Sequence, residues 1–162
     1  MSIEIRSAIH ADAAAVSRLM EANYLTNGGL LSAMFPESKV IEVMDAMPMI
    51  VAVDSGELVG FLMSSELDGY KEVPAVQRML EAYKPTEGAY IYGPICVSSS
   101  HRGQGIAQEL FAVLKSQVPS TEGVLFIRSD NDKSIKAHTN MGMTIRGEYE
   151  HDGVKHFVLS YF

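Results

Sequence analysis

Residues 91–118 read IYGPICVSSSHRGQGIAQELFAVLKSQV, and this stretch decides the fold. An apolar strand is expected to end at Val97, and apolar residues recur at helical spacing from Ile106 onward. Between strand and helix lie a polar turn and two glycines, Gly103 and Gly105. A glycine-rich entry to a helix leaves backbone N–H groups unpaired and aimed at one point. The stretch therefore predicts an anion site that suits a phosphate or pyrophosphate.

The type of anion site follows from what the turn contains and lacks. A dinucleotide fingerprint would have glycine where Gln108 stands, and a P-loop would end in Gly-Lys-Ser/Thr. The pattern that fits is R-x-x-G-x-A after an apolar strand, formed by Arg102, Gly105 and Ala107. It resembles the coenzyme-A pyrophosphate loop of the GNAT superfamily of N-acetyltransferases. A second segment, Asn-x-x-Ser-x-x-x-His-x-x-x-Gly-Met over residues 131–143, extends the resemblance to the family's second cofactor-contacting helix.

The resemblance implies acetyl-CoA as the co-substrate. In the family, backbone amides of the loop hold the pyrophosphate, while the preceding strand pairs with the pantetheine arm and offers an amide to the oxyanion. The cofactor-binding residues implied here are Ile95, Cys96, Val97, Arg102, Gly103, Gln104, Gly105, Ile106 and Ala107, with Asn131, Ser134 and His138 from the second segment. No HExxH or paired CxxC occurs, so no metal site is expected.

His138 is the general acid candidate. Counted back from Gly142 and Met143, it stands where many family members carry the tyrosine that protonates the departing thiolate. A histidine can supply that proton, because its ordinary pKa near 6.5 lets it act as acid or base. The alternative is a helix histidine that only contacts the cofactor or packs.

A general base is harder to identify, because the central strand carries no carboxylate. Glu66, after the third strand, is one weak candidate, and Tyr92 on the central strand is another candidate for catalysis. A water relay would need neither. Tyr24, Tyr90 and Tyr92 are the residues expected to contact the acceptor.

Composition favours one domain over residues 1–162. Thirteen basic and twenty acidic residues give a net charge of −7, which disfavours nucleic acid and anionic membrane and favours a cationic substrate. The single cysteine, Cys96, excludes an internal disulfide and suits a reducing compartment. Neither a secretory leader nor an apolar run of about 18 residues is present, so a cytoplasmic location without membrane contact is expected.

Periodicity predicts an α+β fold of order βααββ(α)βαβαββ, which is GNAT-like, with a mixed, largely antiparallel sheet flanked by helices. Strands are expected at 3–6, 49–54, 58–64, 89–97, 124–128, 143–150 and 154–161, and helices at 12–23, 38–47, 74–83, 106–118 and 131–141, with a break at Asn27-Gly28-Gly29. The stretch between Glu66 and Gly88 is an insert, because in the shortest version of this fold the two flanking strands are joined tightly. It is either an appendage over the sheet or a lid on the acceptor site.

These observations predict an N-acetyltransferase. It would transfer an acetyl group from acetyl-CoA to a primary amine, of a small molecule or an exposed peptide, by direct attack in a ternary complex. The alternatives are a non-catalytic acyl-CoA-binding module and the same fold using a different acyl-CoA. A homodimer is also expected, because family members often pair through the closing hairpin, which here ends in the apolar residues Phe157, Leu159, Tyr161 and Phe162.

Overall fold

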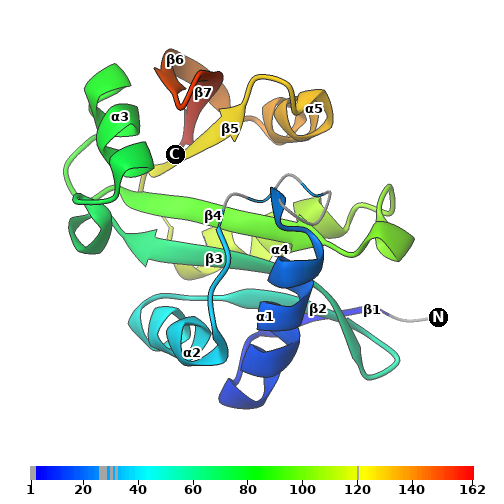
Figure 1. The fold of residues 1–162 in the computed structure, drawn as a ribbon. Coiled ribbons are helices and arrows are strands. Elements are labelled where there is room, and N and C mark those ends of the chain that lie inside the picture. Colours follow the sequence, from blue (N-terminus) through cyan, green and yellow to red (C-terminus); the bar gives the residue numbers. More distant parts are fainter. Residues whose placement is uncertain (1–2, 26–28, 30, 32, 120) are drawn as a thin grey trace. The chain divides into compact units, whose positions relative to one another are not determined.

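The computed structural model describes residues 3–25, 29, 31, 33–119 and 121–162 (Figure 1). Its strands form one mixed sheet in the order β1-β2-β3-β4-β5-β7-β6. The pair β4–β5 is parallel, and the pairs β1–β2, β2–β3, β5–β7 and β6–β7 are antiparallel. The elements are β1 (Ile3–Ser7), α1 (Ala13–Ala22), α2 (Glu37–Ala46), β2 (Ile50–Asp54), β3 (Glu57–Glu66), α3 (Pro74–Ala82), β4 (Tyr90–Val97), α4 (Ile106–Gln117), β5 (Gly123–Arg128), α5 (Asp132–Asn140), β6 (Thr144–His151) and β7 (Val154–Tyr161). This order confirms the predicted fold class.

The chain divides into two compact units. The first unit comprises Met1–Ser64 and Gly93–Pro119, and the second comprises Ser65–Tyr92 and Ser120–Phe162. Strand β4 begins in the second unit and ends in the first. The single domain expected over residues 1–162 stays a prediction.

In the first unit, the period of two along β2 and β3 sends side chains to two faces of the sheet. Val51 and Phe61 pair across these strands and are buried with α1 and α2, which are blue and cyan in Figure 1. This buried cluster consists of Ala13, Val16, Met20, Val40, Val43, Met49, Val51, Phe61, Met63 and Cys96. On the other face, a Cβ added to Gly60 would lie 3.5 Å from the Ile106 side chain. The beginning of α4 is therefore packed against β3, which fixes the position of the loop before it.

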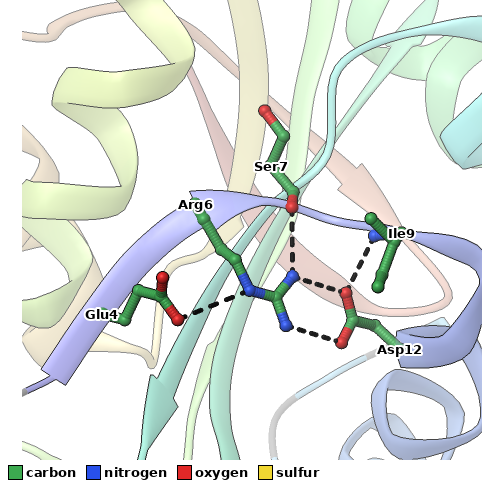
Figure 2. A network of polar contacts seen from close by, with 5 residues as sticks. All are labelled: Glu4, Arg6, Ser7, Ile9 and Asp12. Atoms are coloured by element: carbon green, nitrogen blue, oxygen red, sulfur yellow. Dashed lines mark hydrogen bonds and ion pairs between the residues drawn. The ribbon is translucent and has the colours of Figure 1, made fainter.

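Two charged side chains fix the start of α1. Arg6 donates from Nη1 and Nη2 to the two carboxylate oxygens of Asp12, at 2.8 and 3.0 Å, as Figure 2 shows. The same carboxylate accepts from the backbone N–H of Ile9 at 2.8 Å. The bond from Arg6 is the main reason why the pKa of Asp12 lies below its usual range. The sequence predicted a helix from residue 12 onward; the structure places Asp12 at the N-cap of α1 and adds the pairing with β1. Of the predicted break before α2, Asn27 and Gly28 lie outside the described residues.

In the second unit, the insert forms α3 and packs on the sheet. Its apolar residues Val76 and Met79 join a buried cluster whose other members are Ile91, Val124 and Val158. Arg78 Nη2 donates to the carbonyl of Glu150 on β6 at 2.6 Å. At Gly147 the backbone comes so close to α3 that a Cβ would lie 2.9 Å from the carbonyl oxygen of Ala82. This packing supports the appendage interpretation of the insert.

Candidate functional site

The predicted pyrophosphate loop lies in the first unit, between β4 and α4. Gly103 and Gly105 have φ angles of +77° and +78°, in the left-handed region that glycine enters without steric cost. Gly105 is the N-cap residue directly before α4, and among the described residues no side chain caps this helix end. The N–H groups of a first helical turn have no intrahelical acceptor, and the helix dipole adds positive potential there. The loop therefore has the geometry of an anion site.

The side chain of Arg102, next to this loop, contacts protein groups that the sequence did not predict. Its Nε donates to the carbonyl of Val97 at 3.1 Å, and its Nη2 donates to Oδ1 of Asn23 at 2.8 Å. The guanidinium therefore joins the end of β4 to Asn23, the residue that directly follows α1. Asn23 lies 79 residues from Arg102 in the chain, so no local pattern could have identified this contact.

A second side-chain contact ties the loop to the β2–β3 turn. His101 places Nε2 2.8 Å from Oδ2 of Asp54 and Nδ1 2.7 Å from Oγ of Ser100. The bond with His101 is the main reason why the pKa of Asp54 lies below its usual range. This contact also spans a long separation, 47 residues, and was missed by sequence reasoning.

The strand residues assigned to the pantetheine arm lie at the end of β4. Cys96 is buried in the first unit's core, and this burial raises the pKa of its thiol to about 11. The thiol therefore keeps its proton near neutral pH and is a poor nucleophile. Ile106 is also buried, so it can offer a ligand only its backbone N–H, whereas the side chain of Gln104 is exposed. The backbone N–H of Ser98 donates to the Val59 carbonyl at 2.7 Å and holds the strand end against β3.

In the second unit, the structure brings His138 and Tyr92 together. His138 is only 3% exposed, and its Nε2 lies 3.0 Å from the hydroxyl of Tyr92. Its Nδ1 lies 2.7 Å from the carbonyl oxygen of Ser134. A carbonyl oxygen can only accept, so Nδ1 carries the proton and Nε2 accepts from Tyr92. Burial lowers the pKa of His138, an effect that the bond to Ser134 partly opposes, and the imidazole is therefore neutral near pH 7.

Local contacts in α5 hold His138 in this orientation. The Asn131 side chain caps the helix by accepting from the backbone N–H of Ser134 at 3.3 Å. One helical turn later, Ser134 Oγ lies 3.2 Å from His138 Nδ1. The spacing Asn-x-x-Ser-x-x-x-His thus has a structural reason, because it caps the helix and places the imidazole partner four residues before the histidine.

Tyr161 is a member of this cluster that sequence reasoning assigned elsewhere. Its ring packs edge-on against Tyr92, with centroids 5.9 Å apart, and its hydroxyl is hydrogen-bonded to that of Tyr90. Burial raises the pKa of all three tyrosines. Tyr161 and Leu159 were expected at a dimer surface, yet both are buried within the second unit. The last four residues of β7 are all buried, so both faces of the strand are covered there and alternation could not have placed Tyr161.

The two remaining candidates are Glu66 in the second unit and Tyr24 in the first unit. Glu66 is exposed at the end of β3, a position typical of a solvated carboxylate. Tyr24 is half-buried just after α1, where its backbone forms a bridge with Leu31. Across the residues the structure describes, potential metal ligands do not gather in groups of three or more. No described helix combines the length and apolar character needed to cross a membrane.

Comparison with known proteins places this geometry in a family. Residues 18–143 match the model of the acetyltransferase (GNAT) family. A search of curated proteins gave no significant match. The fold resembles yncA from Salmonella typhimurium with its cofactor acetyl-CoA, at a TM-score of 0.75, 16% identity and coverage of 99% of this chain and 94% of that one.

Two further solved structures show the same fold over their full length. An N-acetyltransferase from Staphylococcus aureus Mu50 has a TM-score of 0.72 and 20% identity, and the match covers 99% of this chain and 98% of that one. A ribosomal-protein-alanine N-acetyltransferase from Brucella melitensis has a TM-score of 0.70 and 20% identity, with 98% and 99% covered. At these identities the structures support the fold, while the family model confirms the predicted resemblance and enzyme class. The chain therefore belongs to the acetyltransferase (GNAT) family.

Proposed function

We propose that the protein transfers an acetyl group from acetyl-CoA to a primary amine by direct attack in a ternary complex. The observation that carries this proposal is the buried hydrogen bond between Tyr92 and His138. Binding of acyl-CoA alone requires only the anion loop, so a buried, oriented Tyr–His pair favours a role in proton transfer. Burying such polar groups is costly unless they are paired, and a relay for protons accounts for their presence.

The loop before α4 fits the pyrophosphate of acetyl-CoA. A Cβ added at Gly103 would meet nothing within 4 Å, so space lies beside the backbone where a ligand would approach. The uncapped start of α4 offers N–H donors, which is the chemistry that a pyrophosphate requires. We assign the pyrophosphate to the amides of Gly103 to Ala107 and the pantetheine arm to Ile95, Cys96 and Val97, as the family resemblance implies.

Tyr92 and His138 supply the proton transfers. The ammonium group of the acceptor first loses one proton to solvent. The free amine nitrogen then attacks the thioester carbonyl carbon, and a C–N bond forms while a backbone amide of β4 stabilises the oxyanion. Tyr92 then takes the proton of the attached nitrogen as its own proton moves to Nε2 of His138. The resulting imidazolium is held by the Ser134 carbonyl, which accepts from Nδ1.

The second half of the reaction returns this proton. The oxyanion collapses, the C–S bond breaks, and the thiolate leaves with the electron pair. The imidazolium of His138 gives its proton back through Tyr92 to the thiolate sulfur, so the products are an amide and coenzyme A with a free thiol. Each turnover leaves Tyr92 and His138 in their starting protonation states. His138 thus acts first as a base and then as the acid that its sequence position suggests.

The acceptor class follows from charge and from the relatives. A net charge of −7 favours a cationic amine over an acidic one. The Brucella melitensis relative is named for acetylating a ribosomal protein at alanine, which supports a peptide amine as one kind of acceptor. Tyr24 and Tyr90 are the proposed acceptor contacts, although Tyr90 also supports Tyr92 through their shared neighbour Tyr161.

Location and assembly complete the proposal. Cys96 is a buried free thiol, in keeping with a reducing cytoplasm. We propose a homodimer that pairs through the closing hairpin, where Phe162 is 57% exposed. The acidic net charge disfavours nucleic acid as a partner.

The function is tested by measuring thiol release from acetyl-CoA with a panel of small primary amines and short peptides. Calorimetric titration measures the binding of coenzyme A in parallel. Coenzyme A is expected to bind, and at least one amine is expected to give steady thiol release. Binding without turnover on any amine would instead identify an acyl-CoA-binding module. Turnover with propionyl-CoA but not with acetyl-CoA would show that the enzyme transfers a different acyl group by the same mechanism.

A further inference from the structure

Three side chains of the first unit form a hydrogen-bonded chain directly before the anion loop. They are Ser100 and His101, in the turn after β4, and Asp54 at the end of β2. A serine bonded to a histidine that a carboxylate orients is the arrangement that activates a serine hydroxyl for nucleophilic attack. We infer that Ser100 is a nucleophile with His101 as its base, and that small acyl phosphates acylate it. The choice of donor rests on the proposed function, because it uses the same anion loop.

The two ring nitrogens of His101 have separate partners. Nε2 lies 2.8 Å from Oδ2 of Asp54, and Nδ1 lies 2.7 Å from Oγ of Ser100. The bond with His101 is the main reason why the pKa of Asp54 lies below its usual range, so this carboxylate is ionised near pH 7 and can only accept. In the neutral imidazole, Nε2 therefore carries the proton and Nδ1 accepts from the Ser100 hydroxyl. This is the tautomer that a base for Ser100 requires.

Backbone bonds hold the members of this chain in place. The helical turn Ser99–His101 is closed by a bond from the backbone N–H of His101 to the Ser98 carbonyl at 2.9 Å. Asp54 is paired with both β1 and β3, so the carboxylate that orients the imidazole stands on a strand with a neighbour on each side. A site supported by such elements keeps its geometry better than one carried by loops alone.

Exposure differs along the chain in the way that a nucleophile needs. The side chains of His101 and Asp54 are 17% and 13% exposed, whereas Ser100 is exposed. Water therefore competes little for the bond that orients the imidazole, while a small acyl donor can reach the serine from solvent. The connection between the loop and the β2–β3 turn needs only the bond between His101 and Asp54. The further bond to Ser100 polarises a hydroxyl at the surface.

The neighbouring loop indicates the class of donor. It begins directly after His101, and its backbone N–H groups have the geometry of an anion site. A Cβ added at Gly103 would meet nothing within 4 Å, so a ligand has room beside this backbone. A donor whose leaving group is a phosphate can place that group on the loop while its acyl carbon meets Ser100 in the same turn. Acyl phosphates have this chemistry.

The reaction has two steps. Ser100 Oγ attacks the carbonyl carbon of the acyl phosphate, and its proton moves to Nδ1 of His101. The bond between that carbon and the phosphate oxygen breaks, and phosphate leaves with the electron pair and takes the proton from Nδ1. A water molecule then attacks the serine ester and gives a proton to Nδ1, which returns it to Ser100 Oγ as the ester bond breaks. The products are a carboxylic acid and inorganic phosphate.

The test incubates the full chain with acetyl phosphate and measures both the acetyl group on Ser100, by peptide mass spectrometry, and the release of phosphate. Hydroxylamine cleaves an ester on serine but not an amide on lysine, so it distinguishes the two products. The variants are Ser100→Ala, His101→Gln, Asp54→Asn and Ser98→Ala. Ser98 is the matched control, because its Oγ lies 3.1 Å from Ser100 Oγ in the same turn but outside the proton path. Circular dichroism checks that each variant is folded.

The wild type is expected to form the hydroxylamine-sensitive ester and to release phosphate, and Ser100→Ala to do neither. His101→Gln should slow the reaction by about 10²-fold or more, Asp54→Asn by about tenfold, and Ser98→Ala by less than about threefold. The Kd for coenzyme A should stay unchanged in all four variants. If His101 and Asp54 only fastened the loop, their substitution would weaken coenzyme A binding instead.

The inference is overturned if Ser100 stays unacetylated and the wild type releases phosphate no faster than Ser100→Ala. It is also overturned if His101→Gln reacts as fast as the wild type. Acylation of Ser100 by p-nitrophenyl acetate but not by acetyl phosphate would overturn the assigned class of donor. Ser100→Ala should transfer acetyl from acetyl-CoA to an amine at the wild-type rate, so a failure of this inference is distinguishable from a failure of the proposed function.

Discussion

The anion loop of the first unit and the Tyr92–His138 pair of the second unit rely on different parts of the chain. The loop works through backbone N–H groups, and its geometry depends on the positive φ angles of Gly103 and Gly105. The pair works through two side chains that are buried and hydrogen-bonded to each other. Most side chains of the loop should therefore be replaceable without loss of binding, whereas removal of one polar atom from the pair should slow proton transfer strongly. Mutations in the loop should therefore change the affinity for coenzyme A, whereas mutations in the pair should change the rate of the chemical step.

The largest effect is expected for His138→Ala. Loss of the proton acceptor should lower kcat by about 10²-fold or more, the range for a positioned acid or base. The Kd for acetyl-CoA should change less than threefold, because the loop supplies most of the binding. The measurement is steady-state thiol release together with calorimetry.

The pH dependence of kcat and a control variant of a second histidine distinguish a role of His138 in proton transfer from a role in packing. Because burial lowers the pKa of His138, the wild-type kcat should fall only below pH 6.5, as the imidazole becomes protonated and can no longer accept. This acid limb should vanish in His138→Ala. His156 is a second buried histidine of the same unit with a lowered pKa, bonded through Nδ1 to the Val154 carbonyl. If His156→Ala lowers kcat as much as His138→Ala does, both losses result from disturbed packing and not from lost proton transfer.

The next effect concerns the loop. Gly105→Asp adds a carboxylate and a Cβ where the pyrophosphate is proposed to bind, and should weaken coenzyme A binding at least tenfold, about 1.4 kcal/mol. Gly153→Asp is the control, since Gly153 has nearly the same φ, +75°, in the hairpin turn of the second unit. It carries a similar backbone strain and should leave the affinity unchanged. If calorimetry gives the two variants equal affinities for coenzyme A, the assignment of the pyrophosphate to this loop is wrong.

The smallest effect concerns Glu122, a buried carboxylate that neither site uses. Burial alone would raise its pKa, but hydrogen bonds from the Tyr83 hydroxyl at 2.6 Å and the Thr86 N–H at 2.7 Å outweigh this and lower it. A carboxyl with a lowered folded pKa stabilises the fold above its unfolded value, here 4.5, and this stability is lost as the pH falls further. Urea unfolding should show the free energy of unfolding falling below pH 4.5. Glu122→Gln should flatten this dependence at a cost of about 1 kcal/mol at pH 7. An unchanged slope in the variant would assign the acid sensitivity to other groups.

The strand, turn and helix that form the loop could be predicted from the sequence because they are contiguous. A strand, two glycines and an amphipathic helix within 91–118 define the anion site without any long-range contact. His138, chosen by its distance from Gly142 and Met143 along the chain, stays a predicted site residue. These are sites whose geometry is set by local backbone conformation.

The contacts that complete each site could not be predicted, because they join distant residues through the fold. Tyr92 and His138 are 46 residues apart, and Arg102 and Asn23 are 79 apart. Pairing such residues requires strand order and register, which periodicity does not give. The apolar end of the chain shows the same limit: Tyr161 packs on Tyr92 in its own unit, although the family resemblance and the apolar residues of the closing hairpin suggested a dimer surface.

The most direct test of the account is the single-turnover rate of acetyl transfer by Tyr92→Phe at saturating acetyl-CoA and amine. This change removes only the hydroxyl that bonds His138 and keeps the ring that packs on Tyr161. We predict a rate about 10²-fold below the wild type, with an unchanged Kd for acetyl-CoA. A single-turnover rate within threefold of the wild type would contradict the proposed role of the Tyr92–His138 pair.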